Sequence, residues 1–265
     1  MLSYDFVLRA FAASGLVALV AGSVGWFLVL RGQTFAGHAL SHVGFAGATG
    51  AVLIGVPPLA GMVAFTLLAG LGMGLLAERL SGRDVAIGIV LAVALAFGLL
   101  FLNLNKSTSL QATSILFGNV LAVSPTMLIT LGILCVIALG ILALLSRSLL
   151  FATLQPELAE ARGVSPRLIG TLFLGVVALA VAQSVQIVGV LLVFALMVGP
   201  PAAAQLLTTR VLPGIALSAV LAIGEAWLGI TISWHSDLPT SFSIVLVSAL
   251  VYFAAVAGTR GSRSA

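Results

Sequence analysis

Charged residues are scarce in this chain. Lys, Arg, Asp and Glu together make up 7% of its 265 residues, whereas hydrophobic residues make up 61%. A soluble domain of this length needs far more polar surface to cover its core, so the composition excludes that class. It indicates instead an all-α, polytopic membrane protein, in which each helix satisfies its own backbone polar groups.

Lysine and cysteine each occur only once. Lys106 follows Asn105 rather than a glycine, so a phosphate-binding loop of the Gly-Lys-Ser/Thr type is excluded and ATP hydrolysis would need another subunit. The lone Cys135 supports no disulfide framework.

The 11 basic residues are dispersed, so the pI near 10.2 does not indicate nucleic-acid binding. The mixed charge of Met1 to Arg9 is not typical of a cleavable signal peptide.

Catalytic motifs are also missing. His38 and His42 have the spacing of a zinc-hydrolase helix, but no glutamate follows the first histidine to act as general base. No nucleophile motif supports Ser/His/Asp catalysis. The chain is therefore not expected to be an enzyme.

The apolar residues are arranged in long runs. Most runs reach the ~20 residues that a helix needs to cross the hydrocarbon core. Residues 168–207 suit two spans joined near Gln183 to Gly189, which predicts about nine spans, although eight are possible. Pro200-Pro201 removes two backbone donors, so the second of these helices should break or kink near its end. The nine segments are 7–30, 35–55, 58–78, 84–104, 125–146, 168–186, 187–207, 213–233 and 241–258.

The basic residues fall mostly on one side of this nine-span arrangement. Arg9 and Lys106 lie on one side, and the other nine lie in alternate gaps or in the C-terminal tail. The positive-inside rule therefore predicts a cytoplasmic C-terminus and an external N-terminus. An eight-span count would put both termini on one side and remove the asymmetry. The nine residues are Arg31, Arg79, Arg83, Arg147, Arg162, Arg167, Arg210, Arg260 and Arg263.

Two gaps are long enough to carry structure. The outer gap contains a mildly apolar stretch, Leu110 to Val123, which suits a short re-entrant or surface helix. In the inner gap Pro156 can start a helix, Glu157 suits its N-terminal end and Gly163 can stop it. The inner segment is either a docking element for a soluble partner or an ordinary connecting loop.

His38 and His42 are the best indication of what the protein handles. Their spacing places them on one helix face, about 6 Å apart along the axis. Imidazole is a common zinc ligand, and ionisable groups inside a membrane usually mark a polar pathway. Gly37, Ser41 and Gly44 form a neighbouring stripe of small residues that lets another helix approach closely.

The histidine pair has two interpretations. Two copies of the chain that meet across an axis would supply four nitrogens, the number that a tetrahedral zinc site prefers. Alternatively, one or both rings hydrogen-bond to a neighbouring backbone and bind no ion. Ligand spacing within a membrane segment favours metal contact.

Three further residues are weaker candidates for metal contact. Glu225 lies in the middle of segment 213–233, where a carboxylate must face water, take a hydrogen-bond partner or be protonated. It is either a way-station for cations or a structural hydrogen-bonding group. His235 and Asp237 lie in an expected outer turn, which either receives metal or a binding protein or is an ordinary solvated turn.

Five stretches of the chain resemble the membrane permease subunits of bacterial ABC importers for zinc, manganese and iron. The resemblance runs over nearly the whole length, and it rests on the order and spacing of the stretches. Phe35–Gly47 is similar to the second-helix signature of that family, Leu116–Val123 to its outer re-entrant segment, Pro156–Ala159 with Gly163-Val164 to its cytoplasmic coupling segment, Val188–Leu192 through Pro200–Ala204 to its late broken helix, and Asp237–Val245 to its final hairpin.

The resemblance implies a fold, a location and a set of partners. It implies a single transmembrane permease domain, residues 1–265, in a bacterial plasma membrane, with no permanently bound cofactor. The implied partners are a cytoplasmic ABC ATPase dimer, a second permease copy and an extracellular or periplasmic metal-binding protein, with membrane lipid around the helices. The residues implied to dock on the ATPase are Pro156, Glu157, Leu158, Ala159 and Gly163.

One position departs from the family pattern. His38 stands where the family usually has an aspartate, whereas His42 matches the family histidine. In a pair of copies this change removes two negative charges and adds nitrogen donors, which favours zinc over manganese as the transported ion. The departure equally leaves open that another metal is carried.

Two other functions stay open. A transporter or channel driven by an ion gradient would use Glu225 and the histidines as a relay, and it would work without an ATPase. An ABC importer of an organic metal chelate would need a wide cavity and no histidine ligands.

Overall fold

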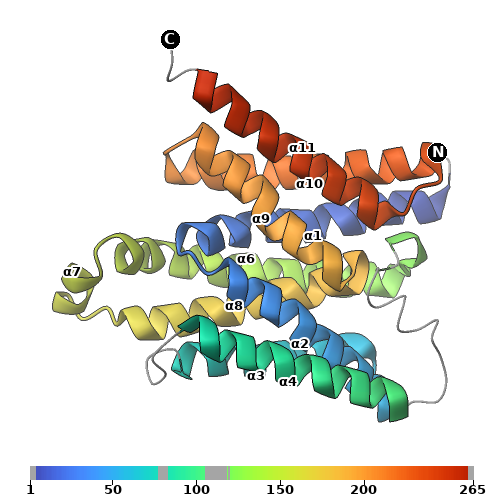
Figure 1. Cartoon of the computed structure of the whole chain (residues 1–265), viewed down its shortest axis with the longest axis horizontal. Coiled ribbons are helices and arrows are strands. Elements are labelled where there is room, and N and C mark those ends of the chain that lie inside the picture. The colour runs from blue at the N-terminus through green and yellow to red at the C-terminus, as the bar shows by residue number, and fades with distance from the viewer. Residues whose placement is uncertain (1–3, 77–82, 105–117, 119, 262–265) are drawn as a thin grey trace.

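The computed structural model describes residues 4–76, 83–104, 118 and 120–261, and every regular element in these ranges is helical. Figure 1 shows a bundle of long helices with one short helix, α7, at one end. The long helices are α1 (Asp5–Leu30), α2 (Thr34–Leu53), α3 (Pro58–Leu76), α4 (Arg83–Leu104), α6 (Pro125–Leu154), α8 (Pro166–Val188), α9 (Val190–Leu207), α10 (Val211–Ser236) and α11 (Thr240–Gly261); the short elements are the 3-10 turn η1 (Val120–Ala122) and α7 (Pro156–Ala161).

Each predicted apolar segment coincides with one long helix. Within the described ranges, seven of these helices are long and apolar enough to cross a membrane. The remaining two are α2, which carries the histidine pair, and α9, whose apolar part is Leu192–Leu207. The fold is therefore that of a polytopic helical membrane protein.

Segment 168–207 forms two helices, as the nine-segment interpretation predicts. Gly189 alone joins α8 to α9, and its φ of 83° is a conformation that favours glycine. The backbone of this corner lies so close to Gly118 that a Cβ there would overlap Val188 and Gly189. A single residue thus separates the two helices.

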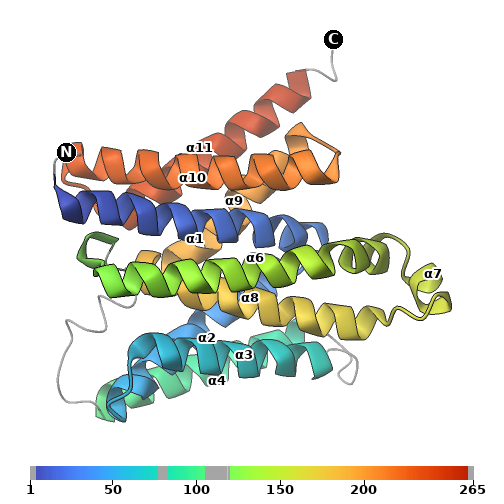
Figure 2. The same ribbon diagram turned by 180° about the vertical axis from the view of Figure 1, so that it is seen from behind.

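The two termini lie at opposite ends of the bundle. In Figures 1 and 2, the start of α1 lies far from α7, whereas the end of α11 lies toward the α7 end. An odd number of membrane crossings has this consequence. Which end faces the cytoplasm stays a prediction.

Helices α1 and α8 are enclosed by the others. Phe27 of α1 and Phe173 of α8 are fully buried, and their ring centroids lie 6.3 Å apart. The outer helices expose large apolar side chains, such as Leu144 of α6 and Phe253 of α11. Apolar residues on the outer surface suit a chain whose solvent is lipid.

Small residues bring α3 into close contact with α8. Gly70 and Gly74 lie against the α8 backbone, whereas Gly72 between them faces open space. Thr66 donates a hydrogen bond to the Ala178 carbonyl across the same interface, at 3.1 Å. This is the close approach that small residues allow between membrane helices.

Of the break or kink expected near Pro200-Pro201, the break is wrong, because α9 runs through both prolines to Leu207. Pro201 has no N–H to bond the Met197 carbonyl four residues earlier. Gly25 of α1 lies directly against that carbonyl and against the Pro201 ring. Packing of a neighbouring helix therefore holds this segment helical although two backbone donors are missing.

The inner gap contains the predicted short helix. Pro156 is its first residue, Glu157 lies in its first turn, and Gly163 follows it with a φ of 79°. The predicted outer re-entrant segment falls largely on residues 105–117 and 119, which lie outside the described residues. Only Gly118, η1 and Val123 of that stretch are described, so that element stays a prediction.

Candidate metal site

His38 and His42 lie side by side on α2. Their ring centroids are 4.9 Å apart and the ring planes are nearly perpendicular, at 84°. The helix produces this arrangement directly, because residues four apart occupy the same face in successive turns. The two rings therefore lie on one face of α2, as their spacing in the sequence predicts.

Each ring has a nitrogen without a protein partner. The Nδ1 atoms of His38 and His42 are buried, and neither has a hydrogen-bond partner among the described residues. Both side chains are partly exposed overall, so the rings lie at the surface of the single chain. Buried ring nitrogens are normally hydrogen-bonded, so two neighbouring rings without such a bond at Nδ1 are unusual.

The small-residue stripe beside the pair faces the interior of the same chain. Gly37 lies against Leu28 of α1, and Gly44 lies against Thr66 of α3 and Val185 of α8. This packing fixes the rotation of α2 and leaves the histidine face directed outward.

Phe194 of α9 borders the pair. Its ring centroid lies 5.1 Å from that of His38, at an interplanar angle of 70°. Sequence reasoning missed this residue, because nothing near Phe194 in the chain distinguishes it from other apolar residues of α9. Its ring shields one side of the His38 imidazole from solvent or lipid.

One chain provides too few ligands for a complete site. Within the part of the chain that the structure describes, no group of three or more His, Cys, Asp or Glu side chains is close enough to hold one ion. Two imidazoles leave a tetrahedral ion with two open positions. Further donors must come from a second copy, from water or from another subunit.

Glu225 is not part of the histidine site. It lies on α10, which does not pack against α2 in the described structure. Its side chain is 2% exposed, and neither carboxyl oxygen has a partner at hydrogen-bond distance, although the Ser248 hydroxyl of α11 interacts with it. Ser248 in turn lies against Gly199 of α9. The carboxyl group is thus enclosed among α9, α10 and α11.

His235 and Asp237 are exposed at the end of α10, also apart from the pair. The His235 Nδ1 lies 2.8 Å from the Thr231 carbonyl oxygen, and Asp237 has a left-handed backbone with a φ of 54°. A groove of about 400 Å³ at this end includes Trp234 and Asp237. These contacts are those of a helix terminus and its turn.

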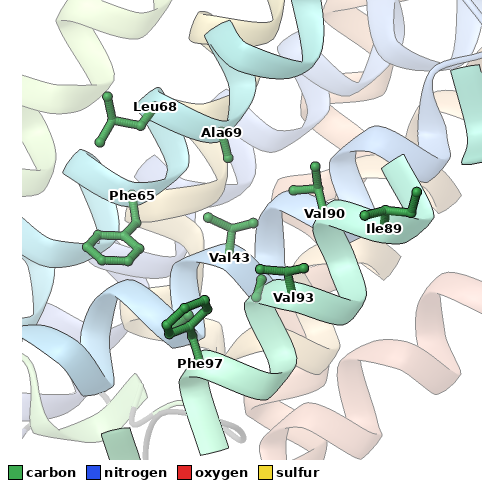
Figure 3. Close-up of a pocket in the computed structure, with 10 residues that line it drawn as sticks. Val43, Phe65, Leu68, Ala69, Ile89, Val90, Val93 and Phe97 are labelled. Carbon is green, nitrogen blue, oxygen red and sulfur yellow. The ribbon is translucent and has the colours of Figure 1, made fainter. Parts of the chain in front are cut away.

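A cavity beside α2 is unsuited to metal. Figure 3 shows it between α2, α3 and α4, with a volume of about 410 Å³ and only apolar side chains around it. Val43, which directly follows His42, points into it together with Phe65 and Phe97. None of these side chains offers a metal ligand.

Comparison with known proteins assigns the chain to a family. Residues 3–259 match the model of the ABC 3 transport family. The chain belongs to this family. It is 35% identical over 254 residues to the manganese transport system membrane protein MntC of Halalkalibacterium halodurans, covering 95% of this chain and 87% of that protein. It is 32% identical over 256 residues to the chelated iron transport system membrane protein YfeC of Yersinia pestis, covering 96% and 86%.

A solved structure agrees with this assignment. The chain superposes on a chain of PsaBC from Streptococcus pneumoniae, solved in complex with Fab, with a TM-score of 0.86 and 28% identity over 95% of this chain and 91% of the other. Membership of the ABC 3 transport family confirms the resemblance drawn from the five sequence stretches. It does not by itself identify the ion or the ligands in this chain.

Proposed function

We propose that this chain is the membrane permease subunit of an ATP-driven importer of a divalent metal ion, with zinc the favoured cargo and manganese the alternative. The observation that carries the proposal is the adjacent pair His38 and His42, whose Nδ1 atoms lack protein partners. The names of the relatives, which describe manganese and chelated iron transport, support a metal cargo.

Two copies of the chain form the transport path in this proposal. One copy brings two imidazoles to its surface, so a two-fold axis beside α2 would bring four nitrogens to one ion. The pair then acts as a transient coordination point or gate. Phe194 would limit access of water to the ion from the α9 side.

The preference for zinc follows from donor chemistry. Imidazole nitrogen suits zinc, whereas carboxylate oxygen suits manganese. The family position that usually holds aspartate is His38 in this chain, so the pair provides nitrogen donors and no negative charge. Relatives whose names include manganese leave room for manganese here as well.

Restoring the aspartate should change the ion preference. In the reconstituted transporter, His38→Asp is expected to shift the ratio of manganese- to zinc-stimulated ATP hydrolysis toward manganese by about tenfold, because a carboxylate replaces a nitrogen donor. His38→Asn is the matched control, since it has the same size as Asp without the charge, and it should weaken both responses without reversing their order. An unchanged ratio in His38→Asp would mean that this side chain does not touch the ion.

The energy source in this proposal is a cytoplasmic ATPase dimer that docks on α7. Glu157, Leu158 and Glu160 are exposed on this short helix, whereas Ala159 is fully buried against the bundle. Movement of α7 would therefore be transmitted to the ends of α6 and α8 on either side of it.

An external binding protein delivers the ion to the opposite end, where the N-terminus lies. In this orientation the C-terminus is cytoplasmic and all nine long helices cross the bacterial plasma membrane as one domain.

Truncating an exposed leucine of α7 should weaken this coupling. Leu158→Ala is expected to reduce recovery of the ATPase with the purified permease about tenfold, because it removes a large exposed apolar side chain of α7 that the interface would bury. Leu154→Ala is the matched control, since Leu154 is also exposed but lies at the end of α6. Equal recovery for the two variants would argue against α7 as the docking element.

A gradient-driven carrier is the competing function, and the enclosed Glu225 is the observation that favours it. Metal uptake into liposomes that contain the permease alone would support that function. Uptake that requires the ATPase and ATP supports the importer.

A further inference from the structure

A second groove runs along the outside of the bundle, away from the histidine pair. Its floor is α1, with Phe27 and Ser23, and its walls are α6 and α10. Its volume is about 470 Å³. Helix α1 packs against both walls, whereas α6 and α10 are not a packed pair in the described structure, so the groove stays open between them.

The groove is apolar along its length and basic toward one end. Leu139, Ala143 and Ile215 provide the accessible apolar part, and Ser146 and Arg147 lie in the half of the groove nearer α7, with Leu150 one turn beyond them. Arg147 is exposed, and the described residues give it no hydrogen-bond or ion-pair partner. Among the described residues that line the groove, none is acidic. An elongated ligand with an apolar body and an anionic head fits this distribution.

The depth of Arg147 matches a membrane interface. It follows Pro125, the first residue of α6, by 22 residues, which is about 33 Å of helix at 1.5 Å per residue. The hydrocarbon core of a bilayer is about 30 Å thick. The guanidinium therefore lies at headgroup level if α6 begins at the opposite interface.

A second source of positive charge lies at the start of α10, next in sequence to two residues that line the groove. Arg210 immediately precedes α10 and is exposed, and Val211 and Leu212 at the start of α10 line the groove. The first N–H groups of a long helix carry partial positive charge and favour an anion. Arg147 and the start of α10 thus border the groove, and Arg210 directly precedes that helix start.

The groove and the histidine pair lie on opposite faces of the bundle. Helices α2 and α9 lie in front of α1, α6 and α10 in Figure 1, together with α4 and α11, and this order is reversed in Figure 2. A second copy that approached the histidines would therefore leave the groove open to lipid.

We propose that this groove binds one anionic phospholipid from the leaflet at the α7 end of the bundle. An acyl chain lies along Leu139, Ala143 and Ile215, and the phosphate group binds Arg147, with Arg210 adding positive charge. Basic pockets between membrane helices recognise anionic headgroups in this way. The inference goes beyond metal transport and does not depend on it.

Native mass spectrometry of the purified full-length chain tests the proposal. Phosphatidylglycerol and phosphatidylcholine with identical acyl chains are added separately, and the lipid-bound fraction is measured. Phosphatidylglycerol should bind about fivefold more tightly, and Arg147→Ala should remove this preference. Arg162→Ala is the matched control, because Arg162 is exposed near α7 but does not line the groove, and it should keep the preference.

A second variant separates the groove from general surface charge. Ala143→Phe places a ring in the groove without changing charge, and it should reduce binding of both lipids by about fivefold or more. Equal binding of the two lipids by the unaltered chain, or an Arg147→Ala variant that keeps the preference, would overturn the proposal. Efficient cross-linking of Leu212→Cys to a second copy in membranes would do so too, because the groove would then be a protein interface.

Discussion

Replacing both His38 and His42 by alanine is expected to abolish zinc-stimulated ATP hydrolysis by the assembled transporter. The rings touch each other, and their Nδ1 atoms have no partner in the described protein, so the pair has no structural hydrogen bond at these atoms to lose. Loss of a mere outer-shell partner of a metal ligand costs about 10- to 100-fold in affinity or activity, and loss of both ligands should cost at least about 100-fold. The measurement is ATPase activity against zinc concentration in proteoliposomes.

The single variants show whether both rings share one ion. If they do, His38→Ala and His42→Ala should each remove most of the stimulation, and the double variant should lose far less than the product of the two losses. Independent roles would give multiplicative losses.

His235→Ala is the matched control for the histidine variants. It removes the third histidine of the chain, whose ring is exposed at the end of α10 and whose Nδ1 lies beside the Thr231 carbonyl. We expect activity within about twofold of the unaltered protein, as is usual for exposed positions outside a site. Near-normal transport by the double variant His38→Ala and His42→Ala would favour a chelate cargo, which needs no imidazole ligands.

The helices could be predicted because each one is marked by residues that are consecutive in the sequence. A run of apolar residues long enough to cross a bilayer identifies a span without knowledge of its neighbours. The clearest boundary error is at α6, which was expected to end at residue 146 but continues to Leu154. Ser146, Arg147 and Ser148 resemble a loop by polarity, yet nothing there breaks a helix, and a long arginine side chain can reach the interface from a helix end. Pro156 marks the actual boundary.

The histidine pair was predictable for the same local reason, but its surroundings were not. Spacing of four residues determines that the rings meet. Whether that face or the glycine stripe turns inward depends on α1, α3 and α8, which contribute Leu28, Thr66 and Val185 from distant parts of the chain. The contact with Phe194 and the separation of Glu225 from the pair depend on which helices are neighbours in the bundle, which single-segment patterns do not encode.

Substitution of Gly47 by alanine is expected to destabilise the protein by about 1–3 kcal/mol. Gly47 of α2 and Gly61 of α3 lie against each other, so that a Cβ on either one would overlap the carbonyl oxygen of the other. Both carbonyl oxygens belong to helix backbone, which cannot move aside as a flexible side chain would. The two helices would have to separate, and α2 would move together with His38 and His42. Thermal unfolding of the full-length chain in detergent measures the effect on stability.

Gly72→Ala is the matched control and is expected to change stability with the opposite sign. It is the same chemical change in the C-terminal part of α3, but a Cβ at Gly72 meets nothing within 4 Å. Alanine is favoured over glycine in a helix by about 0.5–1 kcal/mol, so this variant should be unchanged or slightly more stable. Comparing Gly47→Ala with Gly72→Ala therefore separates the effect of the contact between α2 and α3 from the higher helix propensity of alanine.

Gly61→Ala extends the test to the other side of the contact. A Cβ at either glycine would overlap the backbone of the other, so a separation of the helices that accommodates one alanine should also make room for the second. The double variant should therefore be less destabilised than the sum of the two single variants, and its zinc response should resemble that of Gly47→Ala alone. Strict additivity, or a Gly47→Ala variant as stable as Gly72→Ala, would mean that α2 and α3 do not meet at these glycines and that the histidine face is positioned by other contacts.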